Sequence, residues 1–174
     1  MFVQYLPRAE FRVNTLMVLA EVGALCKPQY DRVFEQLYLG VMGQLVRFLP
    51  SDVSLKRAFE GGSPAEQLFF RHLALFLAGF YRAHVELLEP EPLRPVLQAG
   101  MAYLVQLTDV DDTEVFKICL EYWLRLATDL YTIEVRRRPL TRASDGAARD
   151  CARAARARCC PARCPPRTDR KSVV

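Results

Sequence analysis

The sequence is poor in the residues from which catalytic sites are usually built, with two histidines and one tryptophan among 174 residues. His72 and His84 stand twelve positions apart in one predicted helix, and a rise of 1.5 Å per residue separates them by about 18 Å. Two imidazoles at that distance cannot share a metal ion or a proton, so we expect both to be rim or partly packed residues of that helix. We predict no enzyme activity, no catalytic residue and no bound cofactor.

Other signals of nucleotide-binding and membrane proteins are also missing. Gly61-Gly62 is a lone glycine pair, and no glycine pattern typical of a phosphate-binding loop occurs, so we expect a turn there. No apolar run reaches the roughly 18 residues of a membrane-spanning helix, and no secretory signal precedes the first helix. We therefore expect a soluble protein of a reducing compartment, without structural disulfides and without membrane contact.

One acidic cluster invites a metal or general-base interpretation: Asp109, Asp111, Asp112 and Glu114. The cluster lacks the alternating ligands, the Gly turn and the terminal Glu of a calcium loop. Asp111 lies three residues before Glu114, the spacing of a capping box, and carboxylates are favourable at a helix start. We therefore predict that this cluster begins a helix and binds no metal.

Charge and cysteine content divide the sequence near residue 135. Residues 1–135 hold 12 basic and 17 acidic residues, a net charge of −5, whereas residues 136–174 hold 12 and 3, a net charge of +9. The basic part is rich in Arg, Ala, Pro and Cys, so we predict a disordered tail over 136–174. Because GC-rich codons encode these amino acids, readthrough or an alternative transcript would explain the tail.

The cysteines follow the same division. Cys26 and Cys119 have apolar neighbours in sequence, and we expect them to behave as small hydrophobes. The tail lacks the two separated ligand pairs of a zinc module and any aromatic residue for stacking a base, so we expect neither a metal site nor specific nucleic-acid binding. The tail cysteines considered for zinc are Cys151, Cys159, Cys160 and Cys164.

Helical periodicity dominates residues 1–135, and no alternation typical of a strand persists. We predict helices over about 8–22, 29–49, 63–88 and 96–105, a short helical turn at 55–59, and a last helix from 111. Ser63-Pro64-Ala65-Glu66 combines an N-cap Ser, a Pro at the first helical position and a Glu at the third. The second helices begin 48 residues apart, close to the ~40–47 of HEAT repeats, so the fold class is an all-α HEAT-repeat solenoid fragment of antiparallel hairpins.

The last helix carries the most distinctive segment, Phe116-Lys117-Ile118-Cys119-Leu120-Glu121-Tyr122-Trp123. Its apolar residues recur three and four apart, which predicts one buried face with Trp123 between the last two helices. This face comprises Val115, Phe116, Cys119, Tyr122, Trp123, Leu126 and Leu130.

This segment resembles the exportin-1 family of nuclear export receptors, which belongs to the importin-β-like (karyopherin) superfamily. Three further segments are similar to central repeats of that family in the same order, so the resemblance runs collinearly over residues 5–131. They are Phe11-Arg12-Val13-Asn14-Thr15-Leu16 with Leu19-Ala20-Glu21-Val22, Gln44-Leu45 with Leu49-Pro50, and Leu73-Ala74-Leu75-Phe76-Leu77 with His84.

The resemblance implies a carrier that binds Ran in its GTP form and proteins with leucine-rich export signals, and that passes through nuclear pores between nucleus and cytoplasm. Because the resemblance covers a short part of such a receptor, we expect weak or no activity from this chain alone. The family's cargo groove lies elsewhere, and Cys119 does not match its cysteine. Lys117, Glu121 and Arg125 mark a polar helix side, and the residues that contact a partner stay unknown.

Two other hypotheses remain open. The helical pairs could form a HEAT scaffold for an unrelated partner, such as a phosphatase. The third hypothesis is a metal-dependent or nucleic-acid-processing enzyme, which would require an activity that disappears when the tail cysteines are replaced.

Overall fold

A computed structural model describes residues 2–50 and 53–137, and the chain divides into two units, residues 1–131 and 132–174. The described residues form helices and no strand, so the predicted all-α class is confirmed. The predicted disorder of the tail and its four cysteines lies outside the described residues. The elements are η1 (Phe2–Tyr5), α1 (Ala9–Gly23), η2 (Pro28–Tyr30), α2 (Asp31–Phe48), α3 (Leu55–Glu60), α4 (Pro64–Leu88), α5 (Arg94–Thr108) and α6 (Thr113–Arg137).

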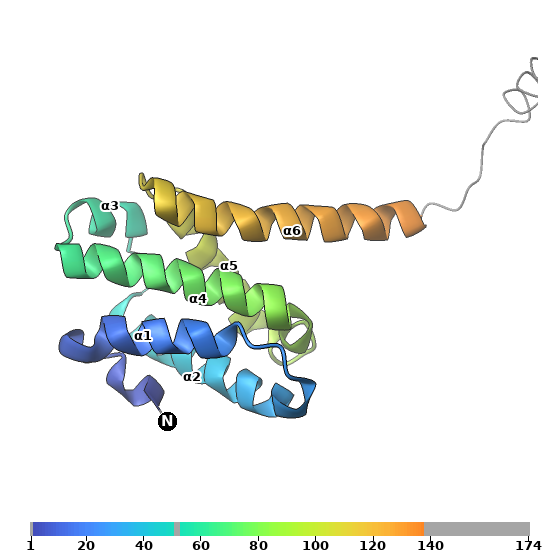
Figure 1. Ribbon diagram of the computed structural model, residues 1–174, viewed down its shortest axis with the longest axis horizontal. Helices are drawn as coiled ribbons and strands as arrows, with labels where there is room; N and C mark the ends of the chain where they lie inside the picture. The colour runs from blue at the N-terminus through green and yellow to red at the C-terminus, as the bar shows by residue number, and fades with distance from the viewer. Residues whose placement is uncertain (1, 51–52, 138–174) are drawn as a thin grey trace, which may run out of the picture. The chain divides into compact units, whose positions relative to one another are not determined.

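In the first unit, α2 and α4 form an antiparallel hairpin. Phe34 near the start of α2 stacks on His84 near the end of α4, with ring centroids 4.1 Å apart. Phe48 at the end of α2 meets Phe69 near the start of α4 at 5.9 Å. Together with α5 and the following helix, this gives two hairpins preceded by the single helix α1, as the sequence predicted (Figure 1).

The second helices of these hairpins run parallel to one another. Arg71 and Tyr81 of α4 contact Asp112 and Tyr122, and both pairs are separated by 41 residues. α1 lies beside α4 in the same direction, so α1, α4 and residues 113–131 of α6 form one layer, with α2 and α5 behind it (Figure 1). This constant offset is the register of a HEAT-repeat stack, in which each hairpin packs on its neighbours.

The centre of the stack holds a buried pair of tyrosines. The Tyr38 and Tyr81 hydroxyls are 2.8 Å apart, and the Tyr38 hydroxyl also donates to the Val96 carbonyl oxygen at 3.3 Å. A Cβ on Gly100 would collide with both hydroxyl oxygens. α2, α4 and α5 therefore meet at a point where only glycine leaves room for the hydrogen bond.

The sequence predicted the start of α4 correctly. The Ser63 hydroxyl accepts from the Glu66 backbone N–H at 3.3 Å, while the Glu66 carboxylate accepts from the Ser63 N–H at 2.7 Å. This reciprocal capping box satisfies two N–H groups that a helix start leaves without intrahelical partners.

The predicted face of α6 was only partly right. Val115, Cys119 and Tyr122 are buried, and Trp123 is half-buried with its ring N–H donating to the Thr108 hydroxyl at 2.9 Å. Phe116 and Leu130, predicted as buried, are 44% and 56% exposed. Periodicity identifies residues that share a side of a helix, but it does not tell whether another helix covers that side.

Candidate interaction surface

An exposed polar strip lies on α6. Lys117, Glu121 and Arg125, singled out from the sequence, are all exposed. Lys117 pairs with Glu114 at 3.0 Å and Arg125 with Asp129 at 2.8 Å along the helix. Exposed pairs of this kind contribute less than about 1 kcal/mol, so these side chains can exchange their partners at little cost.

A shallow groove separates α4 from α6. Ala78 and Gly79 of α4 are small, and a cavity of about 160 Å³ opens beside them against Ile118 and Glu121. A second cavity of about 160 Å³ follows further along the same two helices, where charged side chains of both signs surround it: Arg82, Glu86, Arg125 and Asp129. The groove therefore has an apolar floor and a rim of mixed charge.

Tyr122 forms part of the groove wall and links three helices. Its ring lies 5.5 Å from that of Tyr81 in α4, and its hydroxyl lies 3.8 Å from the Met101 sulfur in α5. Burial, with smaller contributions from Glu89 and Asp129, raises the pKa of the Tyr122 hydroxyl to about 12. Tyr122 therefore stays protonated at neutral pH and serves in packing.

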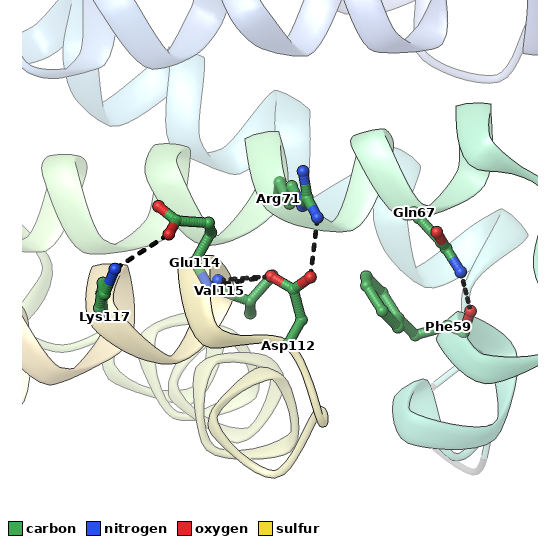
Figure 2. Close-up of polar contacts among 7 residues, drawn as sticks. All are labelled: Phe59, Gln67, Arg71, Asp112, Glu114, Val115 and Lys117. Carbon is green, nitrogen blue, oxygen red and sulfur yellow. Dashed lines mark hydrogen bonds and ion pairs between the residues drawn. The ribbon is translucent and has the colours of Figure 1, made fainter.

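Asp112 joins α4 to the start of α6 (Figure 2). Its carboxylate accepts from the Arg71 guanidinium at 2.8 Å and, through Oδ1, from the backbone N–H groups of Glu114 at 3.1 Å and Val115 at 2.9 Å. The Val115 hydrogen bond is the largest cause of its lowered pKa, and Arg71 and Glu114 contribute further. One side chain thus caps α6 and fixes its position against α4.

The prediction that Asp111 caps this helix was therefore wrong, because the capping contacts come from Asp112 and Asp111 is exposed. Asp109 lies 3.8 Å from the Lys56 ammonium, and Glu114 pairs with Lys117. Among residues 2–50 and 53–137, no group of three or more His, Cys, Asp or Glu side chains could hold a metal ion. Asp109, Asp112 and Glu114 thus pair with three different basic residues.

The two histidines lie in different surroundings. His84 is buried between Phe34 and Phe80, with ring centroids 4.1 and 4.9 Å away. His72 is half-buried. Burial lowers the pKa of both imidazoles. The cause is plain for His84, because its side chain is only 4% exposed. The structure does not bring the two histidines together, although both belong to α4.

The cysteines also differ from each other. Cys119 is fully buried, and burial raises the pKa of its thiol, which makes the thiol a poor nucleophile. Cys26 is exposed in the connection after α1, so its prediction as a packed hydrophobe was wrong. Pro28 follows soon after and begins a short η2 turn that leaves Cys26 outside the core.

Arg71 was not identified from the sequence. Its partner Asp112 lies 41 residues away, and no local pattern connects the two. Tyr81 and Tyr122 are also 41 residues apart. The spacing between successive second helices is therefore the sequence signal that could have identified Arg71.

The stacked helical hairpins of the described residues define a class of protein, the helical-repeat proteins. None of the described helices has a stretch apolar enough to span a membrane. Residues 95–131 match a family model described as chromosome region maintenance or exportin repeat.

Curated relatives extend this match. EXPORTIN 1B of Arabidopsis thaliana is 38% identical over 131 residues, or 74% of this chain. Exportin-1 of Drosophila melanogaster is 39% identical over 124 residues, and exportin-1 of Schizosaccharomyces pombe is 36% identical over 129. The chain spans about an eighth of their length, since 12% of each relative is covered. This chain therefore belongs to the exportin-1 family and corresponds to a short stretch of its helical repeats.

Proposed function

We propose that this chain is a repeat segment of an exportin-1-type nuclear export receptor. Such a receptor carries proteins with leucine-rich export signals out of the nucleus together with Ran in its GTP form, and shuttles between nucleus and cytoplasm through nuclear pores. The observation that carries the proposal is the collinear similarity to exportin-1 over 131 residues. In this function the protein is a carrier and not an enzyme.

The structure suggests what the segment contributes. The offset of 41 residues gives the register in which α4 and α6 pack, and the Arg71–Asp112 pair joins the two helices at one end. In a solenoid, the small rotation from each repeat to the next adds up to the curvature of the whole molecule. The polar strip of Lys117, Glu121 and Arg125 is the surface on which we place a contact with a charged partner.

A replacement experiment tests this function. Residues 5–131 replace the matching stretch in Drosophila exportin-1, and cells depleted of their own receptor carry a fluorescent reporter with a leucine-rich export signal. We expect the hybrid receptor to restore nuclear exclusion of the reporter. A hybrid that folds and reaches normal levels but leaves the reporter nuclear would contradict the proposal.

Two controls sharpen the result. The same hybrid with Lys117→Glu and Arg125→Glu should keep its thermal stability, because both side chains are exposed, and should export less reporter if the strip contacts a partner. The full 174-residue chain, mixed with Ran-GTP and an export-signal peptide, should form no stable complex. Stable capture of a different protein class by the same chain would favour the unrelated scaffold.

A further inference from the structure

Ser63, which directly precedes α4, and Pro64, the first residue of α4, form the only Ser-Pro or Thr-Pro pair in the sequence. Proline-directed serine/threonine kinases require a proline directly after the acceptor, a position that offers no backbone N–H. We propose that Ser63 is a phosphorylation site for such a kinase, and that the phosphate is held by Arg12 of α1. This inference goes beyond the export function and does not depend on it.

The backbone at Ser63 suits an acceptor residue. Ser63 is exposed and has an extended conformation, with φ −65° and ψ 161°. Gly61 and Gly62 precede it in the connection, where the short helix α3 has already ended. The hydroxyl donates to the Glu66 carboxylate at 2.8 Å, an exposed contact that a kinase can displace.

A cavity beside Ser63 offers a place for the product. It has a volume of about 220 Å³, and its lining includes Arg12, Val13, Glu66 and Phe69 along with Ser63. Since a water molecule takes about 30 Å³, there is room for a phosphoryl group and its first hydrating waters. The cavity lies between α1 and the start of α4, so a group bound there would contact both helices.

Arg12 is already held in place at this cavity. Its Nε and Nη2 donate to the carbonyl oxygens of Leu6 at 3.0 Å and Pro7 at 3.1 Å, and its guanidinium carbon lies 4.3 Å from the Phe48 ring centroid. Arg12 also favours the ionised form of Glu66, although the Ser63 hydrogen bonds are the larger cause of that lowered pKa. Arg12 and Ser63 thus line the same cavity, and Arg12 already interacts favourably with a negative charge there, that of Glu66.

The reaction is a phosphoryl transfer from a nucleoside triphosphate bound by the kinase. The Ser63 oxygen forms a bond to the γ-phosphorus, the bond from that phosphorus to the bridging oxygen breaks, and the nucleoside diphosphate leaves. The hydroxyl proton passes to a carboxylate base of the kinase. The product carries a charge of about −1.5 to −2, which repels the Glu66 carboxylate and favours Arg12 and the N–H groups at the start of α4.

The first test uses the full 174-residue chain, a purified cyclin-dependent kinase and ATP, with the modified residue mapped by mass spectrometry. We expect one phosphate, on Ser63. Ser63→Ala should abolish incorporation, and Pro64→Ala, which keeps a good helix former at that position, should reduce the rate at least tenfold. If a peptide of residues 57–68 is phosphorylated and the folded chain is not, the site is inaccessible and the proposal fails.

The second test concerns Arg12. Thermal melts compare the phosphorylated and unphosphorylated chain, and we expect phosphorylation to raise Tm by about 2–4 °C, the shift expected from one new charge-assisted contact. Arg12→Gln should remove this gain, whereas Arg82→Gln, at an exposed position further along α4, should retain it. An equal gain in the Arg12 and Arg82 variants would overturn the assignment of Arg12.

Discussion

α4 and α6 are both 25 residues long, yet they differ sharply in how much of each is buried. α4 has partners on both sides within its layer and buries 11 residues, including Phe76, Leu77 and Phe80 at 0% exposure. α6 buries Val115, Cys119 and Tyr122 among its described side chains. Both helices have an amphipathic sequence, so the difference comes from neighbours and not from local pattern.

Part of the exposed surface of α6, next to the polar strip, is apolar. Phe116, Leu120 and Leu124 recur every fourth residue and are 44%, 48% and 68% exposed. This is the spacing of a face that packs against another helix. The comparison therefore teaches that a helical repeat encodes two contact faces in each second helix, and that the stability of such a helix depends on how many of them are covered.

A matched pair of Leu→Ala substitutions, one in each helix, gives the largest expected difference in the free energy of unfolding. Leu77→Ala in α4 removes a fully buried side chain and should lower the free energy of unfolding by about 2–5 kcal/mol. Leu124→Ala in α6 should change it by less than about 0.5 kcal/mol, because the side chain is 68% exposed. Urea denaturation followed by circular dichroism measures both. Equal losses would show that α6 is packed as tightly as α4.

Two glycine-to-alanine substitutions test the packing of the core behind α4. Gly100→Ala places a Cβ against the Tyr38 and Tyr81 hydroxyls and should destabilise the chain by about 2–4 kcal/mol, through overpacking and loss of the buried hydrogen bond. Gly43→Ala in α2 is the matched control, since nothing lies within 4 Å of its Cβ.

The control should stabilise the helix by about 0.5–1 kcal/mol, because alanine replaces glycine in a helix interior. Chemical denaturation of both variants gives the sign directly. A Gly100→Ala variant as stable as the parent would mean that the three helices do not meet at the tyrosine pair.

Asp112 variants test the junction between α4 and α6. Asp112→Ala removes both the helix cap and the Arg71 pair and should cost about 1–2 kcal/mol. Asp112→Asn keeps a good capping side chain but loses the charge, so it should cost roughly half as much. Lys117→Gln, which removes an exposed pair of the same helix, should have almost no effect.

A double-mutant cycle with Arg71→Gln separates the two roles of Asp112. Asp112→Asn and Arg71→Gln should be less than additive, with a coupling of up to about 1 kcal/mol. Full additivity would assign the whole effect of Asp112 to capping and leave α4 and α6 joined by packing alone.

The sequence alone was sufficient to predict a structural feature where the residues that determine the feature are close together in the chain. Ser63, Pro64 and Glu66 stand within four positions, and the start of α4 was predicted correctly from them. It was insufficient where the determinant is a distant partner. Asp111 and Asp112 are equivalent as local caps, and the contacts that select Asp112 include a guanidinium 41 residues away.

The same reason explains what was missed at the surface and in the core. The polar strip on α6 was predicted, because periodicity places Lys117, Glu121 and Arg125 on one side. The requirement for Gly100 was not, because it comes from two hydroxyls on other helices. The exposure of Phe116 depends on whether a further helix is present, which no property of α6 itself determines.

The smallest expected effect concerns pH and the end of α4. Burial lowers the pKa of His84 in the folded state, so the unfolded chain binds the proton more readily. The contribution of neutral His84 to the free energy of unfolding should therefore be complete above the unfolded pKa of about 6.5. The free energy of unfolding should fall as the pH drops from 7.5 to 5.5. Asp112 affects the pH dependence of stability in a separate, more acidic range. The ordinary pKa of its carboxyl is 3.8, and the folded structure lowers this pKa further.

His84→Phe should reduce the loss of stability between pH 7.5 and 5.5, because an aromatic ring is kept between Phe34 and Phe80 while the proton site is removed. His72→Gln, at a half-buried position of the same helix, should reduce it less. Urea midpoints at the two pH values measure this slope for each variant. If His84→Phe keeps the parental slope, the imidazole is not held neutral by burial, and the tight packing inferred for α4 does not extend to its last turn.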